Sequence, residues 1–174
     1  MMRCLLITAA LLPGLAAAHP HGTVDQQLNL SLGRDKAELT WTIAPPAEQA
    51  GHILAHLDSD GDGIVTVPET AAFMDALLAA TRLTVNGEAV TLAQGDLTEM
   101  APTGSAGLIK LTAIADMPQF PTTPAVVSVE ISYTEFAEEW FIQPFYFEDL
   151  SEGPSPRIER APNALSVSLP PKTR

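Results

Sequence analysis

Cysteine is nearly absent from this chain, since Cys4 is the only one among 174 residues. The residues after it offer no thiol for a disulfide, a thiolate zinc site, a redox motif or a cysteine nucleophile. Any metal held by the rest of the chain must therefore be bound through oxygen or imidazole nitrogen.

Basic residues are also scarce, with nine Lys and Arg against 21 Asp and Glu, for a net charge of −12. Nucleic acids and anionic lipid surfaces bind proteins through basic faces, so this balance argues against both as partners. An acidic surface instead favours solubility and attracts cations.

Long apolar runs are missing as well, apart from a short one between Cys4 and Leu15. It follows Met1-Met2-Arg3 and precedes Ala16-Ala17-Ala18, an order typical of a secretory signal peptide. The run is too short to span a bilayer as a helix, and no later stretch is long enough. We predict a signal peptide over residues 1–18, cleavage near Ala18, and a mature periplasmic or secreted chain without a membrane span.

Alternating polar and apolar residues predict strands at Gln26–Leu32 and Ala37–Ile43, joined by a turn into a hairpin. Asn86-Gly87 predicts a second hairpin. Further strands are expected at Leu108–Ile114, Val126–Tyr133 and Leu165–Leu169. Fifteen prolines and eleven glycines are typical of many short strands and turns.

Between the two hairpins the apolar spacing becomes helical, at Ala47–Leu57 and again around Phe73, Met74, Leu77 and Leu78. We therefore predict a mainly β (α+β) fold. It is an antiparallel β-sandwich formed by residues 19–174 as one domain, with a helix–loop–helix inserted at about 46–80.

The segment that joins the two predicted helices is Asp58–Glu69, with the sequence D-S-D-G-D-G-I-V-T-V-P-E. It has acidic residues at positions one, three, five and twelve and glycine at position six, which is the EF-hand calcium-loop pattern. Calcium takes six to eight oxygen ligands, and Gly63 suits the sharp reversal of such a loop. The predicted calcium ligands are Asp58, Asp60, Asp62, the Ile64 carbonyl, Thr66 and Glu69.

A solvated acidic turn between two helices is the plain alternative for this segment. If Ca²⁺ binds, its role is expected to be structural, because a single EF-hand lacks the usual paired partner. The predicted function is that of an exported calcium-binding protein.

Imidazole offers a second metal hypothesis, carried by His19, His21, His52 and His56. His52 and His56 are four residues apart on a predicted helix and thus on one face. That pair can chelate nickel, cobalt, zinc or copper, whereas two histidines alone also occur as ordinary polar-face residues. The alternative function is a periplasmic accessory or sensor protein for a transition metal, associated with a membrane metal transporter.

An aromatic group stands ahead of a proline-rich tail. Its members are Phe136, Trp140, Phe141, Phe145, Tyr146 and Phe147. We expect most of them to cap the core, with an exposed partner-binding patch as the alternative.

Nothing in the sequence indicates an enzyme. Thr103 stands where the nucleophile elbow around Ser105 requires glycine. The carboxylates Glu135, Glu138 and Glu139 form a short acidic run, which is more often a solvated face than a catalytic pair.

The order of these features suggests relatives. His19-Pro20-His21-Gly22 at the mature start, the hairpin ending in Trp41-Thr42-Ile43, the Asp58–Glu69 loop and the Asn86-Gly87 turn follow one another. This layout resembles the exported domains of bacterial hydrogenase/urease accessory membrane proteins and of periplasmic proteins linked to nickel/cobalt export. The resemblance implies a periplasmic module for a divalent metal, and it carries over only the six calcium ligands of the loop.

Overall fold

We describe the protein from a computed structural model, which describes residues 23–100, 108–118, 124–151 and 154–171. The predicted signal peptide, His19, His21 and the Thr103–Gly107 loop lie outside these residues. Ten strands and three helices follow one another along the described chain: β1 (Asp25–Leu32), β2 (Lys36–Ala44), α1 (Ala47–Leu57), α2 (Val67–Ala79), β3 (Thr81–Val85), β4 (Glu88–Val90), β5 (Ala93–Met100), β6 (Ile109–Asp116), β7 (Ala125–Ile131), β8 (Phe141–Tyr146), α3 (Glu148–Ser151), β9 (Arg157–Ala161) and β10 (Ala164–Leu169).

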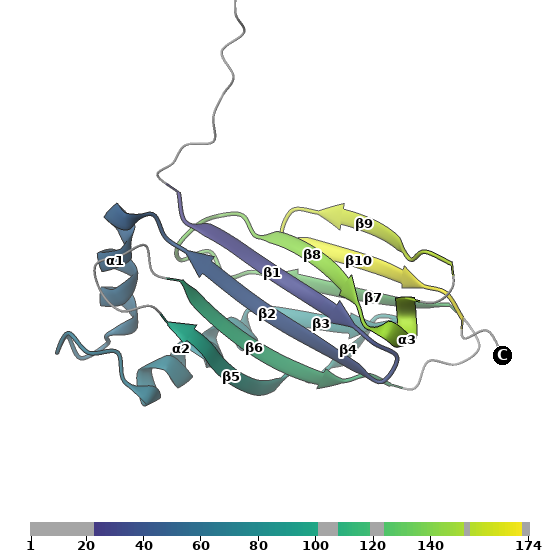
Figure 1. Ribbon diagram of the computed structural model, residues 1–174, viewed down its shortest axis with the longest axis horizontal. Helices are drawn as coiled ribbons and strands as arrows, with labels where there is room; N and C mark the ends of the chain where they lie inside the picture. The colour runs from purple at the N-terminus through teal and green to yellow at the C-terminus, as the bar shows by residue number, and fades with distance from the viewer. Residues whose placement is uncertain (1–22, 101–107, 119–123, 152–153, 172–174) are drawn as a thin grey trace, which may run out of the picture.

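The strands form two five-stranded sheets, with the orders β5-β6-β2-β1-β8 and β4-β3-β7-β10-β9. The prediction of a mainly β fold is therefore confirmed. Helices α1 and α2 lie between β2 and β3 in the chain and stand at one end of the sheets (Figure 1).

Both predicted hairpins are present. β1 pairs with β2 in antiparallel register, with Leu28 opposite Trp41. β3 pairs with β4 across Asn86 and Gly87, whose φ angles are 53° and 86°. A type I′ turn requires positive φ at both central residues, so these values fit the hairpin turn that Asn-Gly predicts. The twist of this turn matches that of the flanking strands.

The expectation of a fully antiparallel arrangement is wrong at one place, where β8 runs parallel to β1, with Leu28 beside Ile142. The other seven pairings among the described strands are antiparallel. A parallel neighbour requires a crossover connection, and β8 reaches the edge of the first sheet only after the chain has built much of the second.

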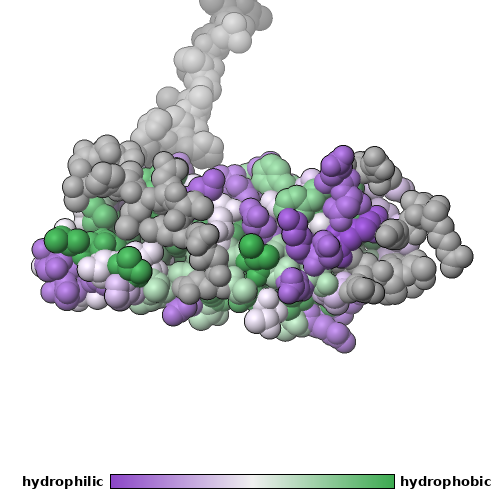
Figure 2. Space-filling model, turned by 60° about the horizontal axis from the view of Figure 1, so that its bottom comes forward, coloured by the Kyte–Doolittle hydropathy of each residue, from purple (hydrophilic) through white to green (hydrophobic). Residues whose placement is uncertain are grey.

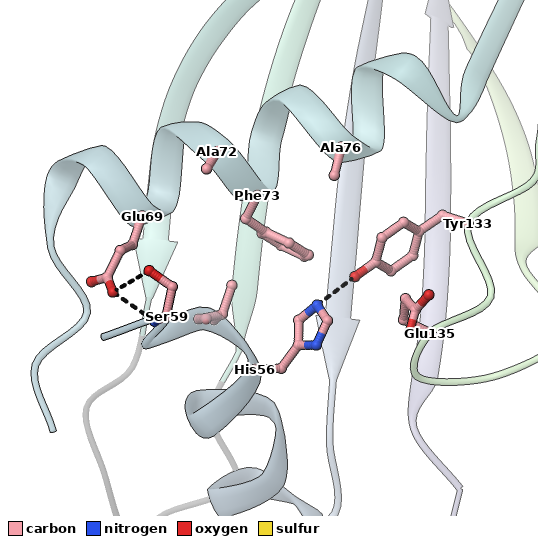
Figure 3. A pocket seen from close by; sticks show the side chains of 9 residues that line it. His56, Ser59, Glu69, Ala72, Phe73, Ala76, Tyr133 and Glu135 are labelled. Atoms are coloured by element: carbon pink, nitrogen blue, oxygen red, sulfur yellow. Dashed lines mark hydrogen bonds between the residues drawn. The ribbon is translucent and has the colours of Figure 1, made fainter. Parts of the chain in front are cut away.

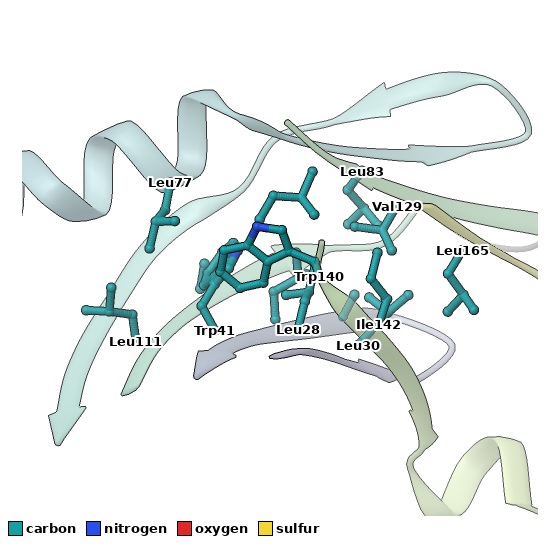
Figure 4. Close-up of a cluster of buried hydrophobic side chains, with 14 of the residues drawn as sticks. Leu28, Leu30, Trp41, Leu77, Leu83, Leu111, Val129, Trp140, Ile142 and Leu165 are labelled. Carbon is teal, nitrogen blue, oxygen red and sulfur yellow. The ribbon is translucent and has the colours of Figure 1, made fainter. Parts of the chain in front are cut away.

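One cluster of buried side chains takes residues from both sheets and from α1 and α2 (Figure 4). Trp41 and Leu28 are fully buried within it, and Leu77 anchors α2 to it. Alternation in β1 places every second residue in this core, as the period of a strand requires. The packing therefore fixes where both helices, and the loop between them, sit on the sheets.

The aromatic group divides between core and surface. Trp140 is buried, and Phe136 and Tyr146 pack against the core, whereas Phe141 and Phe145 are exposed on β8. On the face drawn in Figure 2, hydrophobic residues are scattered among hydrophilic ones. Within the described residues, no helix is both long enough and apolar enough to cross a membrane.

Candidate metal centre

The loop between α1 and α2 begins where α1 ends, because Asp58 is the C-cap of that helix. Gly61 and Gly63 have φ angles of 74° and 86°. No atom lies within 4 Å of a Cβ built on either glycine, so backbone conformation and not space requires glycine there. The sharp reversal predicted at Gly63 is thus present, and Gly61 adds a second one.

Asp58 organises the first half of the loop. Its carboxylate accepts hydrogen bonds from the backbone amides of Gly61, at 2.8 Å, and Asp62, at 3.1 Å, through Oδ1. Its other oxygen, Oδ2, accepts one from the Gly63 amide at 2.7 Å. Three amides directed at one carboxylate hold the chain in a tight turn around that side chain.

Glu69 closes the loop from the first turn of α2. Its Oε1 accepts hydrogen bonds from the Ser59 amide at 2.6 Å and the Ser59 hydroxyl at 2.9 Å. Its Oε2 accepts from the amide and the hydroxyl of Thr66, both at 2.8 Å (Figure 3 shows the Ser59 contacts). Glu69 therefore connects the beginning of the loop to its end.

Thr66 and Glu69 also form a capping box, in which Thr66 is the N-cap of α2 and Glu69 is residue N3. Such a box satisfies amides at the helix start that have no partner within the helix. Sequence reasoning missed this second role of Glu69, although the pattern Thr-x-x-Glu before an apolar run is its usual signal.

These hydrogen bonds determine the acidity of Glu69. Hydrogen bonds from the Thr66 amide and then the Thr66 hydroxyl, together with those from Ser59, lower the pKa of Glu69 from 4.5 to about 2 against an opposing effect of desolvation. Hydrogen bonds to the charged form favour that form. The side chain is thus an anion over the whole physiological pH range.

Three of the predicted ligands come together. One carboxylate oxygen from each of Asp58, Asp60 and Glu69 lies within 4.8 Å of the others. Oxygens bound to one calcium ion at 2.3–2.6 Å are at most about 5 Å apart, so this spacing fits the ion. Asp62 is outside the cluster, and its Oδ1 accepts a hydrogen bond from the Ile64 amide at 2.7 Å.

The apolar residues of the loop differ in their exposure to solvent. Val65 is partly buried and packs against the core. Ile64, whose carbonyl is the predicted seventh ligand, has an exposed side chain, and so does Val67. The core contact of Val65 ties the loop to the sheets.

The predicted histidine pair is placed on α1 with both side chains exposed. His56 also has a partner, because its Nε2 lies 3.3 Å from the Tyr133 hydroxyl. Its ring also meets Phe136 edge to face, with centroids 5.1 Å apart. His56 is thus used in a contact between α1 and the segment after β7, and the transition-metal site stays a prediction.

His56 and Tyr133 line a cleft beside the loop (Figure 3). Ser59, Phe73 and Glu135 line it as well. Burial, followed by the charge of Glu135, raises the pKa of Tyr133 to about 12. The phenol therefore stays neutral and able to donate a hydrogen bond to His56. No local sequence signal links His56 to Tyr133, because the two are far apart in the chain.

No protein-family model matches this chain, and the comparison with curated proteins finds no match either.

Proposed function

We propose that this chain is an exported calcium-binding protein, in which one EF-hand is inserted between the second and third strands of a β-sandwich. The observation that carries the proposal is the approach of Asp58, Asp60 and Glu69, whose carboxylate oxygens lie within 4.8 Å of one another. It is supported by Gly63 in the left-handed region and by the twelve-residue ligand pattern.

The donor set favours a hard cation. All side-chain donors are oxygens, and Asp58, Asp60, Asp62 and Glu69 supply up to four negative charges. Carboxylate, carbonyl and hydroxyl oxygens suit calcium, whereas magnesium requires a near-ideal octahedron and gives up its waters reluctantly. This set of oxygen donors therefore favours calcium over magnesium.

The ion's role is structural in this proposal. Without an ion, the loop carboxylates repel one another, and a bound cation removes this repulsion. An ion that binds only the folded chain also stabilises the folded state by linkage. Both Glu69 oxygens already accept hydrogen bonds from Ser59 and Thr66. Calcium has to compete with these hydrogen bonds, which fits the weak affinity of about 10⁻⁴–10⁻³ M usual for extracellular modules.

Thermal unfolding tests the proposal. The mature protein is melted with excess calcium, with excess magnesium and with a chelator. We expect a higher melting temperature in calcium alone, and identical curves in calcium and chelator would overturn the proposal.

A further inference from the structure

The carboxylate of Glu69 is buried and crowded with hydrogen-bond donors. Its Oε1 accepts hydrogen bonds from the amide and the hydroxyl of Ser59, at 2.6 and 2.9 Å, and from the Asp60 amide at 3.4 Å (Figure 3 shows the two from Ser59). Its Oε2 accepts from the amide and the hydroxyl of Thr66, both at 2.8 Å. Three donors are thus directed at one oxygen and two at the other.

These donors use up the places at which Glu69 could bind an ion. An ionised carboxylate has about four lone-pair sites, shared between its two oxygens. Even without the long contact to Asp60, the four donors at 2.9 Å or less fill these sites. The closing glutamate of an EF-hand loop binds calcium with both oxygens. Glu69 must therefore release one donor from each oxygen before it can bind the ion in that way.

On Oε2 both donors belong to Thr66, whose hydroxyl is itself a proposed ligand of the ion. That hydroxyl can exchange its contact with Glu69 for a contact with calcium. The Thr66 amide can stay bonded to Glu69, as the capping box at the start of α2 requires. Release of the Thr66 hydroxyl is thus compensated within the site.

On Oε1 the donor that can leave is the hydroxyl of Ser59. The amides of Ser59 and Asp60 belong to the loop backbone, which three hydrogen bonds to Asp58 hold in its turn. The Ser59 side chain is exposed, so rotation about a single bond carries its hydroxyl into water. Ser59 is the second residue of the loop, a position that supplies no ligand. Its hydroxyl therefore loses Glu69 without gaining the ion.

We propose that Ser59 sets the calcium affinity of the loop, because its hydroxyl competes with the ion for Oε1 of Glu69. This proposal rests on the calcium-binding function proposed above. Since Glu69 is buried, water replaces a lost hydroxyl only in part, and an oxygen with fewer donors gains more from a cation. Removal of the Ser59 hydroxyl should therefore strengthen calcium binding, whereas removal of a ligand weakens it.

Three variants test the role of Ser59. Ser59→Ala removes the hydroxyl and keeps the amide, and Ser59→Thr keeps a hydroxyl at the same position. Ser132→Ala is the matched control, because it removes a hydroxyl that donates a hydrogen bond to the Ala80 carbonyl at 3.1 Å, outside the loop. Calorimetric titration of calcium into each demetallated protein gives the affinity. Urea unfolding in chelator gives the stability of the ion-free state.

We expect Ser59→Ala to bind calcium about fivefold more tightly than wild type, since a partly buried hydrogen bond to a carboxylate no longer opposes the ion. The same variant should be less stable than wild type in chelator, because the ion-free protein has lost that hydrogen bond. Ser59→Thr and Ser132→Ala should bind calcium nearly as wild type does. A general structural role of Ser59 would not produce tighter binding together with lower stability.

Wild-type binding in the same titrations separates the two proposals. If wild type binds calcium and Ser59→Ala binds it equally or more weakly, the role of Ser59 is overturned and the calcium proposal stands. If neither protein binds calcium, both proposals are overturned. Unchanged stability of Ser59→Ala in chelator, or equally tighter binding by Ser132→Ala, would also overturn the role of Ser59.

Discussion

Replacing Asp58 separates the two roles that the structure gives this side chain. Without calcium, Asp58 holds the turn by accepting hydrogen bonds from Gly61, Asp62 and Gly63. All three bonds are exposed, so water replaces them partly, and each is worth about 0.5 kcal/mol at the lower end of the usual range. Asp58→Ala should therefore cost about 1.5 kcal/mol in chelator. Asp58→Asn keeps a carbonyl oxygen for two of the amides and should cost about 0.5 kcal/mol.

Calcium adds a second contribution to the stability differences among these proteins. At about 10 mM calcium and a Kd of about 10⁻⁴ M, linkage stabilises wild type by about 2.7 kcal/mol. Loss of one ligand charge in Asp58→Asn should weaken binding about tenfold or more, which leaves at most about 1.4 kcal/mol. Asp58→Ala should gain less still.

Urea unfolding of the three proteins, each in calcium and in chelator, measures these differences. Asp75→Asn is the matched control, because it makes the same charge change on an exposed position of α2 outside the loop. An equal calcium-induced gain in stability in wild type and Asp58→Asn would show that the Asp58 carboxylate does not bind the ion.

Three further predictions concern the loop, the core and a turn. Folding lowers the pKa of Glu69 to about 2, so the stability that its carboxylate contributes is present above pH 4.5 and is lost as the pH falls toward 2. In chelator, Glu69→Gln should therefore lose less stability on acidification than wild type. Urea unfolding at each pH measures this difference. Leu77 is fully buried, so Leu77→Ala should lower the free energy of unfolding by about 2–5 kcal/mol, and a loss below about 1 kcal/mol would contradict the packing of α2 (Figure 4). Gly87 has a φ of 86°, so Gly87→Ala should lower the free energy of unfolding by about 1 kcal/mol or more. Gly51→Ala within α1 should instead raise it by about 0.5–1 kcal/mol. Thermal melts in which both variants change stability in the same direction would contradict this argument from backbone conformation.

The elements that the sequence predicted well carry local signals. The helix predicted at Ala47–Leu57 is α1, with the same bounds, because apolar residues recur at helical spacing between Pro46 and the acidic loop. The Asn86-Gly87 turn and the alternation of β1 and β2 act in the same local way.

Three strands were missed because their residues do not show a regular apolar alternation. β9 is exposed along its whole length, so no apolar alternation marks it. β8 contains Pro144, a residue confined to strand edges, within a run of aromatics. β5 contains Gly95 and pairs with β6 through register shifts. Only β8 pairs with a strand distant in the sequence, β1, whereas β9 and β5 pair with the next strand along the chain.

In the candidate site, too, local features were predicted and contacts between distant segments were not. Ligand spacing in the loop follows from twelve consecutive residues, and the sequence predicted its acidic and glycine positions. The contact between His56 and Tyr133, by contrast, depends on how α1 packs beside the end of β7. Glu135, Glu138 and Glu139 are exposed, in keeping with the interpretation of that acidic run as a solvated face.

Calorimetric titration of calcium into the demetallated mature protein decides whether the Asp58–Glu69 loop binds the ion. We expect saturable heat at one site per chain in the millimolar range or below, which excess magnesium does not abolish and which Asp58→Asn weakens. No heat at millimolar calcium, or equal competition by magnesium, would contradict it.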